Sequence, residues 1–217
     1  MRIDLHTHSI LSDGELTPAE LVRRAMVLGH DAIAITDHVD MTNVDIVVPA
    51  IIKAAELNEN YIRTIPGAEI THVPPEQIDK VIKRAKELGA EWIVVHGETL
   101  AEPVISGTNI TAAENPDVDV LAHPGLITED VIRKAVDNDI LIEITGRAWH
   151  NVTNGHVVNV ARRYGAKMIV NSDCHAPNDL MDEARAINIG LGAGMTEKEA
   201  KNAVTVTPFE AVKRLSP

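Results

Sequence analysis

The sequence predicts an α/β barrel in which parallel strands alternate with helices, and two observations favour this fold class. Short β-branched or apolar runs alternate with longer amphipathic stretches along the chain, which is typical of strands joined by crossover helices. Side chains suited to metal binding follow almost every one of these runs. The chain has 217 residues, 45% of them hydrophobic, so we expect a single domain over residues 1–217.

Seven runs are predicted to be strands because they are short, apolar or β-branched, and bounded by turn residues. They cover residues 2–5, 31–36, 63–70, 91–95, 118–122, 140–145 and 167–171. Each is followed by a longer segment, so the strands are expected to be parallel. Periodicity alone does not separate a closed barrel from an open doubly wound sheet.

The first predicted helix begins after Thr17, a suitable N-cap, with Pro18 at the first helical position and Glu20 in the first turn. Apolar residues recur at intervals of three and four between residues 74 and 89, which predicts another helix. Residues 97–116 show few helical signals and are expected to form a long loop, a kind of segment that often has a function. Further helices are expected at 44–58, 128–137 and 154–164, and in segments beginning near 196 and 207.

The charge balance is strongly acidic, since 20 basic residues against 32 acidic ones give a formal net charge of -12. Such a chain repels a polyanion. Aromatic residues make up only 2% of the chain, which leaves few side chains for stacking on unpaired bases. A long nucleic acid is therefore a poor candidate partner. A small phosphorylated substrate remains compatible, because bound metal ions reverse the sign of the local field.

The chain contains one cysteine, Cys174, so no intramolecular disulfide forms and a reducing compartment is expected. The first residues run directly into polar side chains, unlike a secretory signal. No apolar run reaches the roughly 18 residues of a membrane-spanning helix. We therefore expect a soluble, cytoplasmic protein with no membrane partner, and the sequence makes no prediction of its oligomeric state.

Candidate metal ligands lie at or just after the predicted strands. They are His6, His8 and Asp13 after the first strand, His38 after the second, Glu69 in the third, His96 and His123 after the fourth and fifth, and Asp173 and His175 after the seventh. In a parallel barrel the carboxyl ends of the strands form one face, so these residues are expected to meet in one pocket. This expectation favours the barrel over the open sheet.

The spacing of the candidates also supports a ligand role. His6 and His8 are two residues apart, as are Asp173 and His175, so each pair points the same way in an extended segment. Imidazole and carboxylate groups bind divalent zinc, iron or manganese. Six histidines with three acids exceed what one ion uses, so we predict two or three divalent metal ions. A capping role in a turn is the alternative for Asp13.

Several other residues are not expected to bind metal. Cys174 alternates away from its neighbours and is expected to be a small buried residue. Asp37 is expected to point away from the metals or to support a neighbouring ligand. The role of Glu143, in the sixth strand, is ambiguous and stays open. Four histidines fall outside the pattern and are expected to be structural or exposed: His30, His72, His150 and His156.

The ordered motifs of the chain resemble those of the PHP family, the polymerase and histidinol phosphatase superfamily. These motifs are His6-Thr7-His8-Ser9, Ser12-Asp13-Gly14, Thr36-Asp37-His38, Gly67-Ala68-Glu69, His96-Gly97, Ala122-His123-Pro124-Gly125 and Ser172-Asp173-Cys174-His175. The resemblance covers essentially the whole chain. It implies a distorted seven-stranded (β/α)7 TIM-like barrel with a trinuclear metal site.

The resemblance also implies how the ligands are shared, with Glu69 similar to the family's bridging ligand. One ion takes His6, His8 and Asp173, a second takes Glu69, His96 and His123, and a third takes Asp13, His38 and His175. The chain departs from some family members at Asp13, where they have histidine. This difference bears on metal preference.

The activity that the resemblance implies is that of a metal-dependent phosphoesterase. Such an enzyme, similar to histidinol phosphatase, hydrolyses a small phosphorylated substrate with a metal-activated hydroxide. Arg147, shortly after the sixth strand, is the candidate for a bidentate contact with the phosphate. An ordinary surface arginine paired with a nearby acid is the alternative for this residue.

Three other functions stay open. The first is a phosphoesterase of the same kind whose substrate is a nucleotide or short oligonucleotide. The second is an amidohydrolase-type metal hydrolase, which shares a His-x-His motif but typically has a carbamylated lysine where this sequence has His96. The third is a non-catalytic ribonuclease P protein component. Relatives of that kind lack the complete ligand set, and the acidic balance argues against an RNA scaffold.

Overall fold

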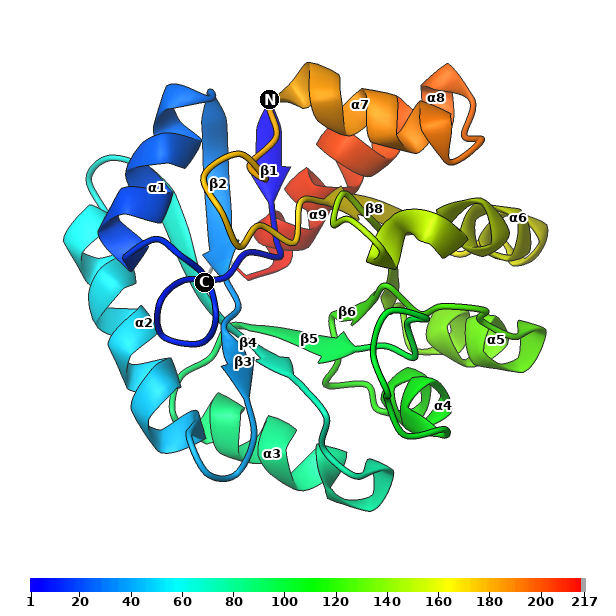
Figure 1. Ribbon diagram of the computed structural model, residues 1–217, viewed down its shortest axis with the longest axis horizontal. Coiled ribbons are helices and arrows are strands. Elements are labelled where there is room, and N and C mark those ends of the chain that lie inside the picture. Colours follow the sequence, from blue (N-terminus) through cyan, green and yellow to red (C-terminus); the bar gives the residue numbers. More distant parts are fainter. Residues whose placement is uncertain (216–217) are drawn as a thin grey trace.

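The computed structural model describes residues 1–215 and shows a parallel sheet that is nearly closed into a barrel (Figure 1). Neighbouring strands in the sheet follow chain order: β1 (Arg2–Asp4), β2 (His30–Ile35), β4 (Arg63–Ile70), β5 (Trp92–His96), β6 (Val120–Ala122), β7 (Leu141–Thr145) and β8 (Met168–Asn171). A two-residue strand, β3 (His38–Val39), also pairs with β4. All of these pairings are parallel. The predicted α/β fold class is therefore confirmed.

The barrel closes just beyond the ends of its first and last strands. Thr7 and Cys174 form an isolated parallel bridge, in which the His8 N–H donates to the Cys174 carbonyl at 2.9 Å. The Asp173 N–H donates to the His6 carbonyl at 3.0 Å. The segments that follow β1 and β8 are thus held side by side, and this closure brings the His6 and Asp173 motifs together.

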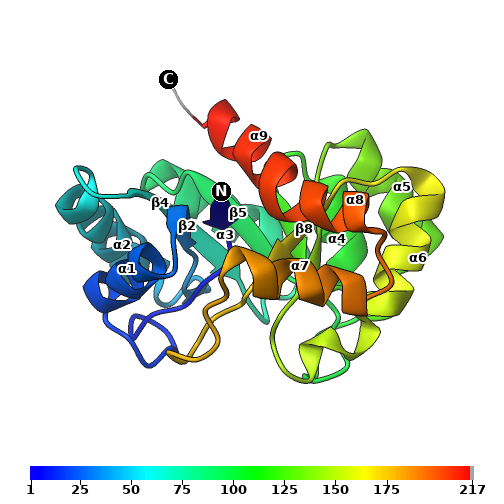
Figure 2. The ribbon, with the colours of Figure 1, turned by 90° about the horizontal axis from the view of Figure 1, so that it is seen from above.

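Helices surround the sheet (Figures 1 and 2). They are α1 (Pro18–Val27), α2 (Val44–Asn58), α3 (Pro75–Glu87), α4 (Thr108–Glu114), α5 (Glu129–Asp137), α6 (Asn154–Tyr164), α7 (Glu183–Gly192), α8 (Glu197–Lys201) and α9 (Thr207–Arg214). A 3-10 turn, His150–Thr153, precedes α6, and a π-helical turn, Asn202–Val206, precedes α9. Among residues 1–215, none of the helices combines the length and apolar character needed to cross a membrane.

The local signals in the sequence account for most of the helices. Thr17 caps α1 by accepting the Glu20 N–H, as predicted. The apolar residues of α3 that recur at intervals of three and four, Ile78, Val81, Ile82 and Ala85, are all buried. These helices pack their apolar faces inwards, so the core lies between helices and sheet.

Three elements were not predicted. The strand β3 is too short to give a pattern. Residues 97–116 were expected to be a loop, but they contain α4, which follows the left-handed Gly107 and has no side-chain cap. The helix α7 contains Gly190 and Gly192, which weaken the helical signal in the sequence.

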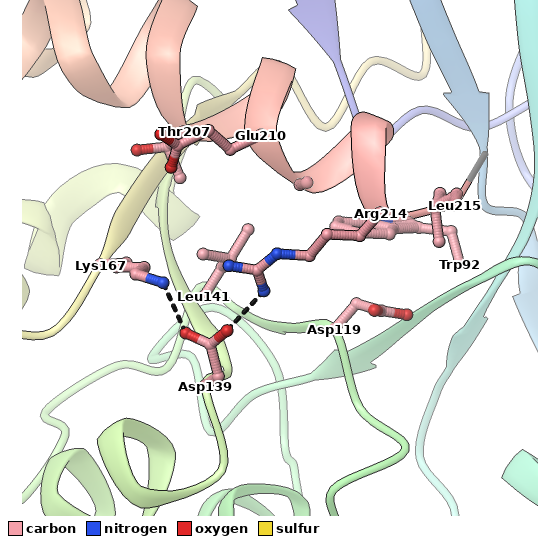
Figure 3. A pocket seen from close by; sticks show the side chains of 10 residues that line it. Trp92, Asp119, Asp139, Leu141, Lys167, Thr207, Glu210, Arg214 and Leu215 are labelled. Carbon is pink, nitrogen blue, oxygen red and sulfur yellow. Dashed lines mark hydrogen bonds and ion pairs between the residues drawn. The ribbon is translucent and has the colours of Figure 1, made fainter.

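The helix α9 covers the end of the barrel where the strands begin (Figure 3). The Trp92 indole N–H donates to the Leu5 carbonyl at 3.0 Å, and Lys167 and Arg214 both pair with Asp139. The cavity left there has a volume of about 50 Å³, too small for a substrate. Figure 2 shows α9 on the opposite side from the loops that follow β1 and β8. The candidate site lies among those loops.

Candidate metal centre

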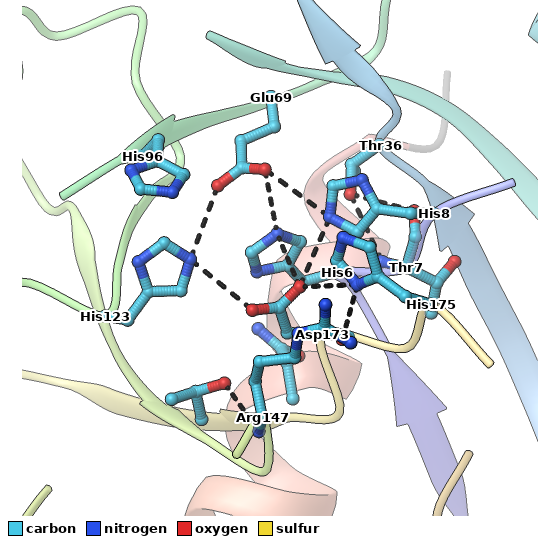
Figure 4. A network of polar contacts seen from close by, with 12 residues as sticks. His6, Thr7, His8, Thr36, Glu69, His96, His123, Arg147, Asp173 and His175 are labelled. Carbon is cyan, nitrogen blue, oxygen red and sulfur yellow. Dashed lines mark hydrogen bonds and ion pairs between the residues drawn. The ribbon is translucent and has the colours of Figure 1, made fainter. Parts of the chain in front are cut away.

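All nine predicted ligands lie at the carboxyl ends of the strands, and Figure 4 shows most of them converging on one point. Eight are buried or nearly so, whereas the Asp13 side chain is 56% exposed. The sequence folds this way because each ligand stands in or just after a buried parallel strand. The structure thus brings together residues separated by up to 169 positions.

Two carboxylates form the middle of the cluster. Glu69 Oε2 lies 3.3 Å from His6 Nε2 and 3.4 Å from His8 Nε2, and its Oε1 lies 3.5 Å from His123 Nε2. Asp173 faces the same three rings from the other side, at 3.8, 3.3 and 3.5 Å. Two atoms that each bind one tetrahedral zinc at about 2.0–2.1 Å are separated by roughly 3.3–3.4 Å. The spacing of the cluster therefore fits metal ligands.

The donor atoms in this cluster are also without other partners. Within residues 1–215, His6 Nε2, His8 Nε2 and Glu69 Oε1 are buried and have no hydrogen-bond partner. Buried polar atoms are rarely left in this state, because the loss of water is costly unless another partner replaces it. The residues present thus fit bound divalent cations.

A second part of the cluster lies nearer the surface. Asp13 Oδ1 is 3.4 Å from His38 Nε2 and 3.2 Å from His175 Nε2. The opposite nitrogen of His38, Nδ1, lies 2.8 Å from Glu69 Oε2. The ring of His8 stacks against His175 with centroids 4.1 Å apart. Asp13 therefore faces two imidazoles, whereas its alternative role was to cap a turn.

Asp37 holds the loop that carries Asp13. Its Oδ1 accepts the Ser9 N–H at 2.7 Å and the Ser12 N–H at 3.1 Å, and both serine hydroxyls also donate to its carboxylate at 2.7 Å. Four donors on one buried carboxylate fix the path of residues 9–13. The geometry agrees with the expectation that Asp37 supports a neighbouring residue.

Glu143 stands behind two of the histidines. Its Oε1 lies 2.7 Å from the ring nitrogen Nδ1 of His6, and its Oε2 accepts the backbone N–H of His123 at 3.0 Å. The amide of Asn171 donates to Oε1 at 3.0 Å. This contact leaves His6 Nε2 turned towards Glu69 and Asp173. The choice left open by the sequence is answered by this geometry, in which Glu143 orients other residues of the cluster.

His96 points to an unexpected partner, Glu102, from the loop before α4. Its Nε2 lies 3.3 Å from Glu102 Oε2, and the same carboxylate is 2.9 Å from His72 Nε2 and 3.4 Å from His150 Nε2. The structure thus brings His72 and His150, which the sequence pattern left out, to the edge of the cluster. Both follow strand ends, β4 and β7, so the positional signal used for the other ligands applied to them too. No signal in the sequence singled out Glu102.

The remaining residues behave as expected. His30 Nε2 and His156 Nε2 each lie 2.8 Å from a backbone carbonyl, of Met181 and Ile127 respectively. Cys174 is buried, and burial raises the pKa of its thiol. These three side chains therefore have structural surroundings away from the cluster.

The backbone of the site is strained at several positions. Positive φ angles occur at His123 (25°), Asp173 (51°), His72 (53°) and Trp149 (70°). A left-handed conformation is uncommon for residues other than glycine, and it persists where the surroundings fix it, often at functional sites. Each of these residues belongs to the site or precedes one of its histidines.

The imidazoles of the cluster have different pKa values because their surroundings differ. Burial and the neighbouring His38 lower the pKa of His8 to about 3. Burial also opposes the protonation of His38, but Glu69 and Asp13 outweigh it and raise the pKa of His38 to about 9. Burial alone would raise the pKa of Glu69, but the surrounding imidazoles hold it well below its usual value. The carboxylates are therefore ionised and favour cations.

Arg147 lies at the mouth of the site, and Figure 4 shows its side chain extending towards the cluster. It lines an open pocket of about 610 Å³ together with Glu102, Trp149 and His150. Its guanidinium contacts Asp179 Oδ2 at 3.4 Å. Asp179 in turn accepts the N–H groups of residues 175 and 176 through the same oxygen. The pairing of Arg147 with an acid is thus long and shared.

Fold and site together define a class of protein, an α/β barrel with a buried histidine–carboxylate cluster at the carboxyl ends of its strands. The PHP domain matches residues 4–100, and the chain belongs to the PHP family, with its metal-dependent phosphoesterase fold. It is 51% identical over 218 residues to the uncharacterized protein MJ1295 of Methanocaldococcus jannaschii, covering 99% of this chain and 100% of that one.

More distant relatives include proteins of two kinds. The ribonuclease P protein component 3 of Methanosarcina barkeri is 25% identical over 230 residues, which cover 99% of this chain and 90% of that protein. A chain in the structure of archaeal ribonuclease P with mature tRNA has a TM-score of 0.71 at 16% identity, covering 97% and 89% of the two chains. These relatives lean against our expectation that a long nucleic acid is a poor candidate partner.

The other kind comprises phosphatases. The metal-dependent tyrosine phosphatases YwqE of Bacillus subtilis and CpsB of Streptococcus pneumoniae are represented by a chain with a TM-score of 0.64 at 17% identity. The similarity covers 99% of this chain and 95% of that one. At such low identity, the similarity to these solved structures establishes the fold alone.

Proposed function

We propose that this protein is a metal-dependent phosphoesterase that hydrolyses a small phosphorylated substrate. The observation that carries the proposal is the placement of Glu69 and Asp173 on either side of His6, His8 and His123. Adjacent divalent cations, when bound, hold phosphate oxygens and lower the pKa of water. The buried cluster is matched to that chemistry by its charge and spacing.

The proposed ligands are the nine residues predicted from the sequence: His6, His8, Asp13, His38, Glu69, His96, His123, Asp173 and His175. The donor atoms of eight of them fall into three groups with mutual separations within 4.8 Å, and His96 lies within the same distance of His123, which supports two or three ions. Glu69 is the proposed bridging ligand, because its two oxygens face different imidazoles. Mixed nitrogen and oxygen donors suit zinc, manganese or iron.

Arg147 is the proposed phosphate contact. Its guanidinium is partly exposed at the mouth of the pocket, and its contact with Asp179 is long. A substrate phosphate offers a charge-assisted bidentate partner, which is stronger than this shared contact. Arg147 would then position the phosphoryl group and stabilise its charge, while the buried cluster carries the reaction.

A second candidate function is hydrolysis of a nucleotide or short oligonucleotide. Trp149 is 78% exposed and lines the same pocket as Arg147. An exposed indole beside a cationic group provides a surface on which a base stacks. This arrangement favours a substrate that has a base next to the reactive phosphate.

A non-catalytic ribonuclease P component and an amidohydrolase-type hydrolase are the rival functions. The presence of all nine ligand-type residues at one end of the barrel supports an enzyme over a scaffold. The absence of a lysine at the end of β5, where His96 stands, supports a phosphoesterase over an amidohydrolase. The buried single cysteine fits a reducing compartment, and the cytoplasm is the proposed location.

An activity screen tests the proposal. Purified protein loaded with zinc, manganese or iron is assayed on phosphorylated metabolites, short oligonucleotides and an amide substrate, with tRNA binding measured in parallel. We expect release of phosphate or nucleotide that is lost in Glu69→Gln and retained in Glu56→Gln, which changes an exposed carboxylate of α2. Tight tRNA binding without any hydrolysis would instead support the scaffold.

A further inference from the structure

A buried ion pair lies at the seam of the barrel, between its first strand, β1, and its last strand, β8. Arg2 Nη2 donates to Asp4 Oδ2 at 2.8 Å, and both side chains are buried, with exposed fractions of 1% and 0%. We propose that these two residues are positioning residues of the metal centre, and that they fix the place of Asp173 in it. The inference rests on the proposed function, because it concerns how a proposed metal ligand is held.

The seam lacks the ladder of backbone hydrogen bonds that joins the other strands. Each of the other pairs of neighbouring strands is joined by at least two consecutive residue pairs. Within residues 1–215, the row of paired strands begins at β1 and ends at β8. The isolated bridge between Thr7 and Cys174 lies beyond the ends of both strands. Side chains therefore hold β1 and β8 in register.

The guanidinium of Arg2 provides the first of these connections. Ile3, which lies between Arg2 and Asp4, belongs to an apolar cluster with residues of the other strands, so its two neighbours point to the opposite side of β1. There, Arg2 Nη1 donates to the Val170 carbonyl at 2.9 Å, and its Nε donates to the Met181 carbonyl at 3.4 Å. One side chain thus joins β1 to β8 and to the segment before α7.

The carboxylate of Asp4 connects the ion pair to the metal centre. Its Oδ1 accepts the backbone N–H of Ser172 at 3.1 Å, and Ser172 immediately precedes Asp173. The side chain of Asn171, one residue earlier, accepts the backbone N–H of Leu5 at 3.1 Å. The three residues before Asp173 are therefore each connected to the first strand or to the residue after it.

Asp173 depends on this support because its own backbone is strained. Its φ angle of 51° is uncommon for a residue other than glycine, and such a conformation persists where the surroundings fix it. Its carboxylate lies 3.3 Å from His8 Nε2 and 3.5 Å from His123 Nε2. A shift of the residues that precede Asp173 would therefore change the distances between the proposed ligands.

A contribution to stability alone is the alternative explanation for the ion pair, and it predicts a different result. Burying two charges is costly, so replacing a buried ion pair by apolar residues of similar volume is often neutral or stabilising. The directional hydrogen bonds of a guanidinium and a carboxylate specify geometry in addition to energy. An apolar replacement of both residues therefore separates positioning from stability.

Metal affinity and thermal stability, measured together, test the inference. Because Arg2→Met/Asp4→Leu leaves no unpaired charge, its Tm is expected to stay close to that of the unchanged protein. Its zinc affinity, measured by competition with a chromophoric chelator, is expected to fall roughly tenfold. The visible spectrum of the cobalt-loaded protein, which depends on the geometry of the ligands, is expected to change. Glu20→Leu/Arg24→Met, in an exposed ion pair of α1, is the control and is expected to keep both metal properties.

Arg2→Lys is a second variant, and it decides the matter if the double variant does not fold. Lysine keeps the charge beside Asp4, but it lacks the planar group that reaches several carbonyl oxygens at once. The variant is expected to fold and to lose roughly two- to fivefold in zinc affinity, the effect of a lost hydrogen bond.

The outcomes separate this inference from the proposed function. If the folded variants keep the zinc affinity and the cobalt spectrum of the unchanged protein, the positioning role is overturned, whatever their Tm, and the proposed metal centre stands. If the unchanged protein binds no zinc, manganese or iron, the proposed function fails and the inference fails with it. A lower zinc affinity together with a changed cobalt spectrum supports the positioning role.

Discussion

Glu143 Oε1 lies 2.7 Å from His6 Nδ1, while the other oxygen of the same carboxylate accepts the backbone N–H of His123 at 3.0 Å. One buried residue of β7 therefore orients the ring of His6, which follows β1, and holds the backbone of His123, which follows β6. A carboxylate behind a metal-binding histidine fixes its tautomer and strengthens it as a ligand. The predictions below begin with this contact.

Glu143→Gln is expected to weaken metal binding roughly 10- to 100-fold, the usual effect of losing a partner behind a ligand. The amide keeps the shape of the side chain but not its charge. Competition with a chromophoric chelator measures the affinity. Glu91→Gln, an exposed residue just before β5, is the control. Equal affinity in Glu143→Gln and the unchanged protein would contradict the orienting role.

Arg147→Ala is expected to lower kcat/KM for a phosphorylated substrate by roughly ten- to a hundredfold, since a hydrogen bond to a charged group contributes about 1.5–3 kcal/mol. Arg147→Lys is expected to recover part of the loss, because lysine restores the positive charge but not the bidentate hydrogen-bonding geometry of the guanidinium. Arg163→Ala, at an exposed ion pair with Glu129, is the control. Unchanged affinity and turnover in Arg147→Ala would end the phosphate-contact proposal.

Trp149→Ala distinguishes the two substrate classes. Base stacking on an aromatic side chain contributes about 1–3 kcal/mol per base, so loss of the indole is expected to reduce activity on short oligonucleotides while leaving simple phosphate esters unaffected. The ratio of kcat/KM for the two substrates is the measurement. If that ratio does not move, Trp149 has no role in recognising a base.

The stability of the metal-free protein is expected to depend on pH through His38 and His8. The pKa of His38 is raised to about 9, so its contribution is complete below about 6.5 and is lost as the pH rises through 9. The pKa of His8 is lowered to about 3, so its contribution is lost as the pH falls from about 6.5 towards 3.

Thermal unfolding of chelator-treated protein checks this dependence. The Tm is expected to fall between pH 6.5 and 9 in the unchanged protein and to fall less in His38→Asn. Added metal displaces the proton from His38, so metal affinity is expected to rise over the same interval. A Tm of the metal-free protein that increases steadily from pH 6.5 to 9 would contradict the assignment for His38.

Much of the fold was predictable because its signals are local. Neighbouring residues in the sequence determine the alternation of strands and helices, the cap at Thr17 and the buried apolar face of α3. The helices α4 and α7 were missed because their own segments are weak helix formers that tertiary packing stabilises.

The candidate site was predictable to the extent that it follows strand ends. That rule placed all nine predicted residues at one face, and its incomplete use left out His72 and His150. Glu102 was not predictable, because its position depends on a loop path fixed by Glu98 and Asn109. The role of Glu143 was not predictable either, because it depends on how the barrel closes. The closure determines which histidine the Glu143 side chain faces.

The most direct test of the central claim is the metal content and phosphoesterase activity of Glu69→Gln. Glu69 connects the imidazoles of His6, His8 and His123 through its two oxygens. We predict that the variant keeps its circular dichroism spectrum, loses bound metal and loses more than about 100-fold in activity. A Glu69→Gln variant with the metal content and activity of the unchanged protein would contradict the account.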